Sequence, residues 1–362
     1  MKKTLIYITL TINSIAAISL LLAYLATYVS PESIVWLPFF GLLYPVSLIA
    51  NLLFIVFWVW RKNWVFLLSF GVIALGFNHL STIFATNSSS GDKIGAGTPL
   101  KILSYNVRVF DLYNWTHNSE TRDNIFNYII HQNADIICFQ EFFNDKTNHF
   151  TTLDSLIKFQ KAREVHAEYT VVSKGIHQFG IATFSRYPIV NKGSIKFPST
   201  NNIVIYSDIK VSEDTIRVYN SHLQSNQFTP DDYFVIDNIG GKERRWLNIF
   251  PVLRKMAITY AKRAQQADVF AKHIAESPHP VVVCGDFNDT PISYTYRTVR
   301  SKLKDAHLES SLWFGHTTVR SFPSFRIDYI LHDPEIKSSN FVRDKVVFSD
   351  HYPIHCLLYL PD

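Results

Sequence analysis

The segment Val281-Val282-Val283-Cys284-Gly285-Asp286-Phe287-Asn288 decides the fold of this chain. Its β-branched apolar run predicts a buried strand, and an acid and an amide follow directly where that strand ends. The same order recurs at residues 346–351, where Val-Val-Phe precedes Ser-Asp350-His351. Strands that bring carboxylate, amide and imidazole groups to one end of a sheet indicate a site for metal-dependent hydrolysis.

Around this segment, residues 100–362 alternate between short apolar runs and a few amphipathic stretches. We predict strands at 101–107, 134–140, 169–172, 180–185, 202–211, 215–222, 281–283, 327–331, 346–348 and 353–360. We predict helices at 122–132 and 245–274. Mixed strands with helices packed outside them predict an α/β fold, a two-sheet sandwich flanked by helices.

Polar residues stand at the ends of most of these strands. They are Asn106, Glu141, His222, Asp286 with Asn288, Asp328, and Asp350 with His351. A single Asp or Asn at a strand end usually caps a turn, so no member of the set is informative by itself. The order and context of the whole set indicate a shared site.

The segment 101–360 resembles the endonuclease/exonuclease/phosphatase superfamily, the deoxyribonuclease I-like proteins. The resemblance rests on six motifs in the order of that family: Ser-Tyr-Asn106-Val, Phe-Gln-Glu141, Asn-Ser-His222-Leu, Gly-Asp286-Phe-Asn288-Asp289, Ile-Asp328-Tyr-Ile and Ser-Asp350-His351. It implies a four-layer α/β sandwich with the site at one edge of the two sheets. It does not extend to the residues before 101.

The resemblance implies a metal side of the site. Glu141 is a hard oxygen ligand suited to Mg²⁺, and Mn²⁺ or another divalent cation is the alternative. Asn106 is expected to orient that carboxylate or a water on the metal, and Asp350 to complete the ligand set.

The resemblance also assigns the catalytic groups. Asp286 is expected to orient or deprotonate the attacking water, and Asn288 to hold the phosphate. His351 is expected to stabilise the charge that develops on the phosphorane, while Asp328 holds the imidazole in the required tautomer. His222 is expected to donate to a phosphate oxygen or to the leaving group. The sequence leaves open how acid and base work is divided among His222, His351 and Asp286.

Arg108 departs from the pattern of the abasic-site endonucleases in this family. Those enzymes have an acidic residue two positions after the first Asn, and this chain has Arg108 there. A missing acid favours a single metal ion and places a guanidinium where it could meet a substrate phosphate. The alternative is an exposed arginine that pairs elsewhere.

The N-terminal region has a different composition. No charged residue occurs at 4–31, 33–60 or 63–91. Each stretch exceeds the ~20 residues that a membrane-spanning helix needs. We predict three transmembrane helices at 5–28, 34–60 (bent near Pro45) and 64–84. The alternative is a cleaved signal peptide followed by buried core helices. The predicted organisation is a membrane anchor at 1–86, a linker at 87–99 and a catalytic domain at 100–362.

Cations near the predicted spans set their expected orientation. Lys2, Lys3, Arg61 and Lys62 flank the helices, so the positive-inside rule places the N-terminus and the 61–62 loop in the cytoplasm. We therefore expect a multi-pass protein of the inner (cell) membrane with its catalytic domain outside the cytoplasm. Asn78 and His79 lie inside the third predicted span, where they could form a functional site or simply pack between helices.

Charge and cysteine content restrict the remaining possibilities. Of the formal net charge of +5, residues 1–100 contribute +3 and the catalytic segment only +2, which does not suggest a dedicated DNA-binding face. Cys138, Cys284 and Cys356 stand in apolar strands and are expected to be buried free thiols. We infer no protein partner.

Three functions remain open from the sequence. The first is a membrane-anchored Mg²⁺-dependent phosphodiesterase that acts on nucleic acid or on a phospholipid or sphingolipid head group. The second is a phosphomonoesterase, and the third is a catalytically silent membrane-binding module. The aromatic and basic insertion at 224–260 could be a packed loop and helix, or a lid that meets bases or a membrane surface.

Overall fold

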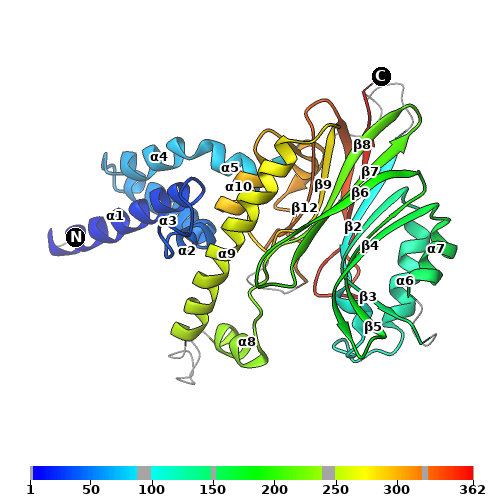
Figure 1. Ribbon diagram of the computed structural model, residues 1–362. Coiled ribbons are helices and arrows are strands. Elements are labelled where there is room, and N and C mark those ends of the chain that lie inside the picture. The colour runs from blue at the N-terminus through cyan, green and yellow to red at the C-terminus, as the bar shows by residue number, and fades with distance from the viewer. Residues whose placement is uncertain (1–2, 88–98, 148–151, 239–248, 320–324, 362) are drawn as a thin grey trace. The chain divides into compact units, whose positions relative to one another are not determined.

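The computed structural model describes residues 3–87, 99–147, 152–238, 249–319 and 325–361 and divides the chain into two compact units (Figure 1). The helical unit comprises Met1–Ile83, Gln224–Ala267 and Thr290–Thr298. The sheet unit comprises Phe84–Leu223, Asp268–Asp289 and Val299–Asp362. The predicted linker lies almost wholly outside the described residues, as do Lys242, Arg244, Arg245 and Trp246 of the insertion.

Two six-stranded mixed sheets form the sheet unit. The first has the order β13 (Lys337–Arg343), β14 (Ile354–Tyr359), β2 (Leu100–Asn106), β3 (Ile136–Asp145), β5 (His177–Ser185) and β4 (Glu164–Ser173). The second has the order β10 (Lys304–Asp305), β12 (Asp328–His332), β9 (Val281–Asp286), β8 (Asp214–His222), β7 (Ile203–Val211) and β6 (Ile189–Lys196). A small pair joins β1 (Ala85–Thr86) to β11 (Leu312–Trp313).

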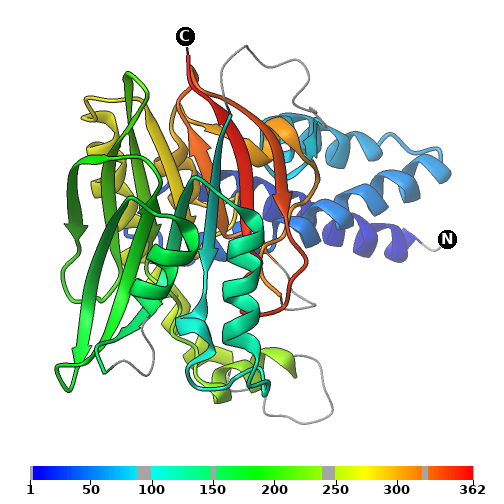
Figure 2. The ribbon, with the colours of Figure 1, turned by 90° about the vertical axis from the view of Figure 1, so that its right-hand side faces the viewer.

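The sheets pack face to face and helices cover their outer faces. Side chains of β2 and β3 meet those of β8, β9 and β12 in one buried apolar cluster that includes Cys138, Cys284 and Cys356, all three of them buried free thiols as predicted. The helices α6 (Thr121–Gln132) and α7 (Thr152–Gln160) cover the first sheet (Figure 2). On the second sheet, Phe270 of α9 (Ile249–Ala275) packs against Tyr219 with ring centroids 5.3 Å apart. The predicted helix-flanked sandwich is confirmed.

The parallel strand pairs carry the predicted polar residues to the same sheet edge. The pair β2 and β3 places Asn106 opposite Gln140, and the pair β8 and β9 places His222 opposite Asp286. The antiparallel pair of β12 and β9 places Asp328 opposite Asp286. Register aligns the groups within each sheet, and the packing of the two sheets brings Asn106 to Asp286.

The predicted strand at 346–348 is wrong. These residues follow β13 without regular pairing, and the side chain of Val347 is 59% exposed. An apolar run predicts a strand only when a sheet buries it, and here only Phe348 reaches the core. The sequence also failed to indicate β6 and β13, whose polar residues suit strands at the sheet edges.

The helical unit contains α1 (Lys3–Ala26), α2 (Pro38–Leu42), α3 (Tyr44–Trp60), α4 (Phe66–Leu75) and α5 (Phe77–Ile83). It also contains α8 (Pro230–Asp237), most of α9 and the start of α10 (Tyr294–Arg300). Val235 of α8 and Val252, Met256 and Tyr260 of α9 form a buried cluster with Phe39 and Leu42 packed against it. The described part of the insertion is therefore a packed element of this unit.

The prediction of three complete membrane spans is wrong as it was drawn. Among the described residues, α1 alone is long and apolar enough to span, and α4 with α5 passes the same test only as a pair bent by 63°. The second predicted span breaks at Leu43, between α2 and the 17-residue α3. The third bends at Gly76, where a Cβ would lie 2.0 Å from the Tyr24 ring, so that ring occupies the space that a side chain would need.

His79 has a packing role in this unit. Its ring stacks on Tyr24 with centroids 4.7 Å apart, and its Nε2 lies 3.2 Å from the Thr27 hydroxyl. Asn78 is exposed. Of the two interpretations of this pair, the structure favours packing for His79.

Candidate active site

The predicted strand-end residues converge around Asp286 at the end of β9. Asp286 is 1% exposed, and its Oδ2 atom accepts a hydrogen bond from Asn106 Nδ2 at 3.1 Å. His222 Nε2 lies 3.8 Å and His351 Nε2 lies 3.7 Å from the same oxygen. One carboxylate oxygen thus meets an amide and two imidazoles that come from three other segments.

Backbone geometry at the end of β9 fixes this carboxylate. Gly285 has a φ of +140°, and a Cβ there would lie 2.0 Å from the carbonyl oxygen of Ser221 on β8, so only glycine allows the two strands to approach. After the strand, the Asn288 backbone amide donates to Asp286 Oδ1 at 2.7 Å. Asn288 Nδ2 donates to Asp286 Oδ2 at 3.2 Å and to the Leu223 carbonyl at 3.0 Å. Asn288 therefore holds Asp286, and its predicted role toward phosphate stays a prediction.

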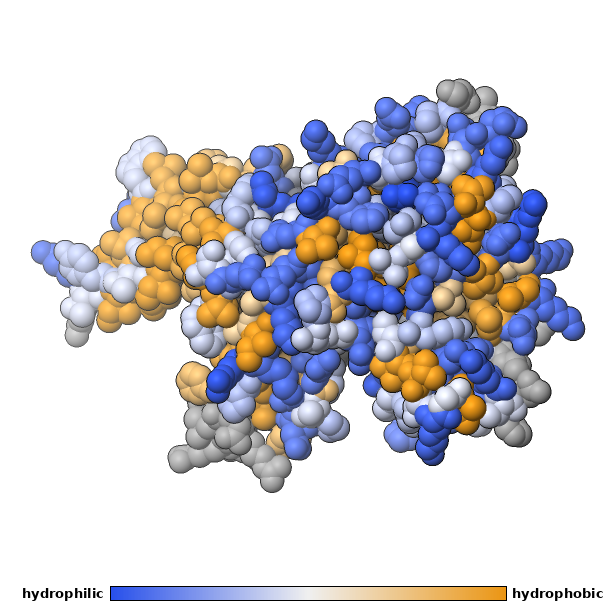
Figure 3. Space-filling model, viewed as in Figure 1, coloured by the Kyte–Doolittle hydropathy of each residue, from blue (hydrophilic) through white to orange (hydrophobic). Residues whose placement is uncertain are grey.

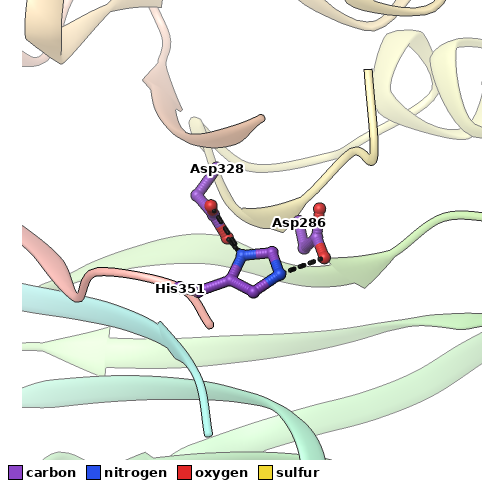
Figure 4. A group of neighbouring side chains, drawn as sticks. All are labelled: Asp286, Asp328 and His351. Atoms are coloured by element: carbon purple, nitrogen blue, oxygen red, sulfur yellow. Dashed lines mark hydrogen bonds and ion pairs between the residues drawn. The ribbon is translucent and has the colours of Figure 1, made fainter. Parts of the chain in front are cut away.

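Asp328 and His351 form a buried pair beside Asp286 (Figure 4). The Nδ1 atom of His351 lies 2.9 Å from Oδ2 and 3.2 Å from Oδ1 of Asp328, while its Nε2 faces Asp286. The backbone amide of Asp328 donates to the Thr317 hydroxyl at 3.1 Å, which fixes the start of β12. This is the arrangement expected of a carboxylate that orients an imidazole.

Burial and neighbouring charges separate the pKa values of the site. Burial opposes protonation of His351, but Asp328 and Asp286 outweigh it and raise the pKa of His351 well above its usual value. Burial lowers the pKa of His222. Burial also raises the pKa of Asp286 to about 6, against the opposing charge of His351. The site therefore combines a cationic imidazole, a neutral imidazole and a carboxylate that can accept a proton near neutrality.

Glu141 lies on the more open side of the site, at a bulge in β3. The pairing of β3 with β5 shifts register between Phe139 and Phe142, and Glu141 has a φ of +50°. A bulge re-aims a side chain, and here the Glu141 carboxylate points to the sheet edge, where Oε1 lies 3.4 Å from Asn106 Nδ2 and 3.8 Å from His222 Nε2. The side chain remains 36% exposed.

The donor set on this side fits a hard divalent cation. Glu141 and Asp350 offer carboxylate oxygens, the ligands that Mg²⁺ prefers. Asn106 turns its amide nitrogen toward Glu141, and its Oδ1 accepts from the Arg108 backbone amide at 3.1 Å. Packing around Glu141 and the negative charge of Asp350 raise the pKa of Glu141, although that side chain still reaches solvent. A bound dication would relieve this repulsion between two carboxylates.

A second group of possible ligand atoms comprises Asp286, Asp328 and His351, which lie within 4.8 Å of one another. His351 Nδ1 already faces both oxygens of Asp328 at hydrogen-bond distance. This contact leaves Glu141 and its neighbours as the predicted metal side, and the catalytic roles of Asp286, Asp328 and His351 stay predictions.

Arg108 lies at the margin of the site. Its Nε is 3.5 Å from Asp350 Oδ2, and its guanidinium carbon lies 4.3 Å from the centroid of the Trp115 ring. The side chain is 31% exposed. Arg108 thus pairs with a predicted metal-side residue, and contact with a substrate phosphate stays a prediction.

Sequence reasoning missed the buried residues that support the site. Gln140 Nε2 donates to Asn220 Oδ1 at 2.7 Å from one sheet to the other, and Asn220 Nδ2 donates to the Ala182 carbonyl at 3.0 Å. Ser349 donates to the Asn106 carbonyl at 2.8 Å. Gln140, Asn220 and Ser349 each stand in a motif that also contains a predicted site residue. Their polar character inside these motifs was the signal that could have indicated their supporting role.

Comparison with known proteins agrees with this geometry. Residues 103–351 match the family model described as Endonuclease/Exonuclease/phosphatase family. The chain belongs to this family. The helices at residues 3–83 match a separate model, described as a domain of unknown function (DUF8431). A search of curated proteins gives no match.

Solved structures of the same family share the fold. An endonuclease/exonuclease/phosphatase from Beutenbergia cavernae is 16% identical with a TM-score of 0.52, and the match covers 73% of this chain and 72% of that one. A protein of the same description from Bacteroides vulgatus is 17% identical with a TM-score of 0.51, and the match covers 73% of this chain and 99% of that one. The chain is accordingly an enzyme of the phosphoric ester hydrolase class, and members of this family generally use a divalent metal.

Proposed function

We propose that this protein is a membrane-anchored phosphodiesterase that uses Mg²⁺ and a water nucleophile. The observation that carries the proposal is the position of Asp286, whose Oδ2 faces His222, His351 and Asn106 within 3.8 Å. Such a carboxylate can orient a water for attack on phosphorus and accept its proton. The pKa of about 6 suits this role near neutral pH.

The remaining groups then have complementary roles. His351, held cationic by Asp328, would donate from Nε2 to a non-bridging phosphate oxygen as charge develops there. His222 would hold a proton at Nε2 for the phosphate or the leaving group, and Asn288 would keep Asp286 in place. Glu141, with Asp350 and Asn106, would hold the cation, which supplies Lewis-acid neutralisation of the phosphate charge.

The many carboxylates in and beside the site favour a phosphodiester substrate over a phosphomonoester. Glu141, Asp286, Asp328 and Asp350 lie in or beside the site, whereas Arg108 and His351 are the cations that the described contacts place there. A diester carries one negative charge and a monoester up to two, so repulsion penalises the monoester more. Phosphomonoesterase activity remains the alternative, and the complete set of predicted groups argues against a silent module.

The helical unit supports the proposed membrane anchor. Its interior contains a buried polar network beside apolar side chains: Asn13 Nδ2 donates to Ser69 at 2.6 Å, Ser69 donates to Asn51 Oδ1 at 2.8 Å, and Trp58 Nε1 donates to Asn13 Oδ1 at 2.9 Å. Its surface is apolar over α1, α3 and α4 (Figure 3). The exposed residues there include Ile8, Ile12, Ile15, Ile18, Leu53, Val56, Phe70 and Leu75.

Polar groups inside and large apolar side chains outside are the pattern of helices that pack in lipid. Water would penalise so large an apolar surface. We propose that α1 crosses the membrane and that the apolar surfaces of α3 and α4 contact lipid. An extracytoplasmic catalytic domain remains a prediction from the positive-inside rule.

One experiment tests the catalytic proposal. The purified full-length chain is incubated with DNA, RNA, sphingomyelin, a phosphomonoester and the base-free diester glycerophosphocholine, each with Mg²⁺ and with excess chelator. We expect a diester in this set to be cleaved only with Mg²⁺. Cleavage of the monoester alone would select the alternative function, and full activity in chelator would contradict the metal assignment.

Membrane fractionation tests the anchor. We expect the chain to stay with membranes in alkaline carbonate and to be released by detergent. Release by carbonate alone would contradict insertion.

A further inference from the structure

An aromatic and cationic surface lies beside Asp350, and we call it the aromatic platform: Arg108, Tyr113 and Trp115. The Arg108 guanidinium stacks over Trp115 at 4.3 Å from the ring centroid. The Tyr113 ring meets the Trp115 ring edge to face, with centroids 5.0 Å apart. The ion pair between Arg108 Nε and Asp350 connects the platform to the residue next to His351. The platform therefore borders the predicted metal side of the site, where the proposed function would place the scissile phosphate.

The platform presents flat groups to solvent. Tyr113 is 61% exposed and Trp115 is 41% exposed. Single exposed aromatic residues are common and need no explanation. Here two rings and a guanidinium meet on one connected surface beside a catalytic site, and the packing of the core does not require either ring to be there.

The backbone that carries the platform is fixed. Each residue of the turn η2 (Arg108–Asp111) has a positive φ between 45° and 56°, a costly conformation for residues other than glycine. The buried side chain of Asp111 offsets this cost by accepting hydrogen bonds from the Thr116 amide, at 3.2 Å, and from the Thr116 hydroxyl. Thr116 in turn contacts Thr121, the first residue of α6, at 2.7 Å. A fixed surface loses little entropy when a ligand stacks on it.

The neighbours of the rings indicate the kind of ligand. Asn114, His117, Asn118, Ser119 and Glu120 surround the rings in sequence, and all are polar and exposed. A segment that inserts into lipid carries apolar neighbours, so this composition disfavours a membrane surface. Flat rings next to a guanidinium suit the face of a nucleobase, which stacks on aromatic and arginine planes.

We propose that the aromatic platform is a base-stacking subsite and that the site acts on single-stranded nucleic acid with an unpaired base next to the scissile phosphate. This inference rests on the proposed phosphodiesterase function and names its substrate class. It also fits the small net charge of residues 101–362, because affinity that comes from stacking needs few phosphate contacts and depends only weakly on salt.

The test compares full-length protein with its Trp115→Ala and Tyr113→Ala variants. Trp313→Ala is the matched control, because Trp313 is a 65% exposed tryptophan elsewhere in the sheet unit. The probes are a fluorescent ten-nucleotide oligothymidylate and an abasic oligomer of the same length. Binding is measured by anisotropy in chelator, and kcat and KM are measured with Mg²⁺.

We expect Trp115→Ala to weaken oligothymidylate binding and raise its KM by roughly tenfold or more, from the loss of base stacking, with a small change in kcat. The affinity of Trp115→Ala for the abasic oligomer should stay close to that of the wild type. The Trp313→Ala variant should bind both oligomers as the wild type does. Equal losses on both oligomers would overturn the proposal, since the ring would then act only by positioning Arg108. Unchanged oligothymidylate binding and KM in Trp115→Ala would also overturn it, since the ring would then contact no base.

Two outcomes separate this inference from the proposed function. If the wild-type chain hydrolyses glycerophosphocholine but neither binds nor cleaves oligothymidylate, the subsite is wrong and the phosphodiesterase function stands. If it binds oligothymidylate through Trp115 but hydrolyses no diester, the subsite stands and the catalytic proposal is wrong.

Discussion

Oδ2 of Asp328 lies 2.9 Å from Nδ1 of His351, and both residues are almost fully buried. The contact fixes which nitrogen of the imidazole faces Asp286, because Nδ1 is occupied and Nε2 is turned toward the carboxylate 3.7 Å away. A residue on β12 thereby orients the imidazole of a residue 23 positions later in the chain.

Asp328→Asn should lower kcat by ~10- to 100-fold, because an amide can donate to Nδ1 and favour the wrong tautomer. If Asp328 acts only through His351, the double variant with His351→Ala should lose little more activity than His351→Ala alone. The measurement is kcat at saturating Mg²⁺ for the two single variants and the double variant. Strictly multiplicative losses would show that Asp328 acts independently, for example as a metal ligand.

Glu141→Gln should reduce activity by orders of magnitude and weaken Mg²⁺ binding while the fold persists, since the amide keeps the shape of the side chain and removes its charge. Activity titrated with Mg²⁺ and the unfolding midpoint measure the two effects separately. Glu164→Gln, an exposed position at the start of β4, is the control. Unchanged Mg²⁺ dependence in Glu141→Gln would exclude Glu141 as the metal ligand.

Gly285→Ala should destabilise the sheet unit by more than about 3 kcal/mol, because its Cβ would collide with the Ser221 backbone at a positive φ. Gly175→Ala is the control that measures the cost of a positive φ without a steric collision of the new Cβ. Gly175 also has a positive φ, of +73°, but a Cβ there would meet nothing within 4 Å, so roughly 1–2 kcal/mol is expected. Chemical denaturation measures both variants, and equal losses would contradict the close approach of β8 and β9.

The strand ends could be predicted from sequence because short apolar runs that stop at a polar residue determine both the strand and the direction of its last side chain. Asn106, His222 and Asp286 end their strands and were found in this way, whereas Asp328 begins β12 and was found through its motif. The bulge that orients Glu141 could not be predicted from the sequence, because it depends on a register shift against β5 that no local pattern encodes. The aromatic platform depends on a turn of four positive φ values, for which the sequence Arg-Val-Phe-Asp gives no signal.

In the helical unit, the sequence indicated the apolar character of the helices but not where they end. Uncharged length indicated three helices. The break at Leu43 stands just before Pro45, near which the sequence predicts a bend, whereas the bend at Gly76 is associated with the Tyr24 ring packed against that glycine. Composition predicts whether a segment is apolar more reliably than it predicts the residue at which a helix ends. The buried network of Asn13, Asn51 and Ser69 was likewise invisible, because each residue alone is an ordinary polar interruption of an apolar stretch.

His307 should make the sheet unit sensitive to mild acid. It is 1% exposed in α11 (Ala306–Ser310), and burial, together with the charge of Arg326, lowers its pKa to about 4. The unfolded chain has the ordinary pKa of about 6.5, so it binds more protons than the folded chain between these values, and stability must fall as pH falls from 6.5 to 4. The full shift corresponds to about 3 kcal/mol at most.

Thermal unfolding of the full-length chain from pH 7.5 to 4 measures this effect. His307→Gln removes the titrating group, so the variant should lose part of the pH dependence in this window even if its stability at pH 7.5 is lower. His131→Gln is the control, because His131 is exposed on α6 and its Nδ1 lies 2.6 Å from the Asn127 carbonyl of its own helix. An identical slope for wild type and His307→Gln would show that His307 is not the group that couples protonation to folding.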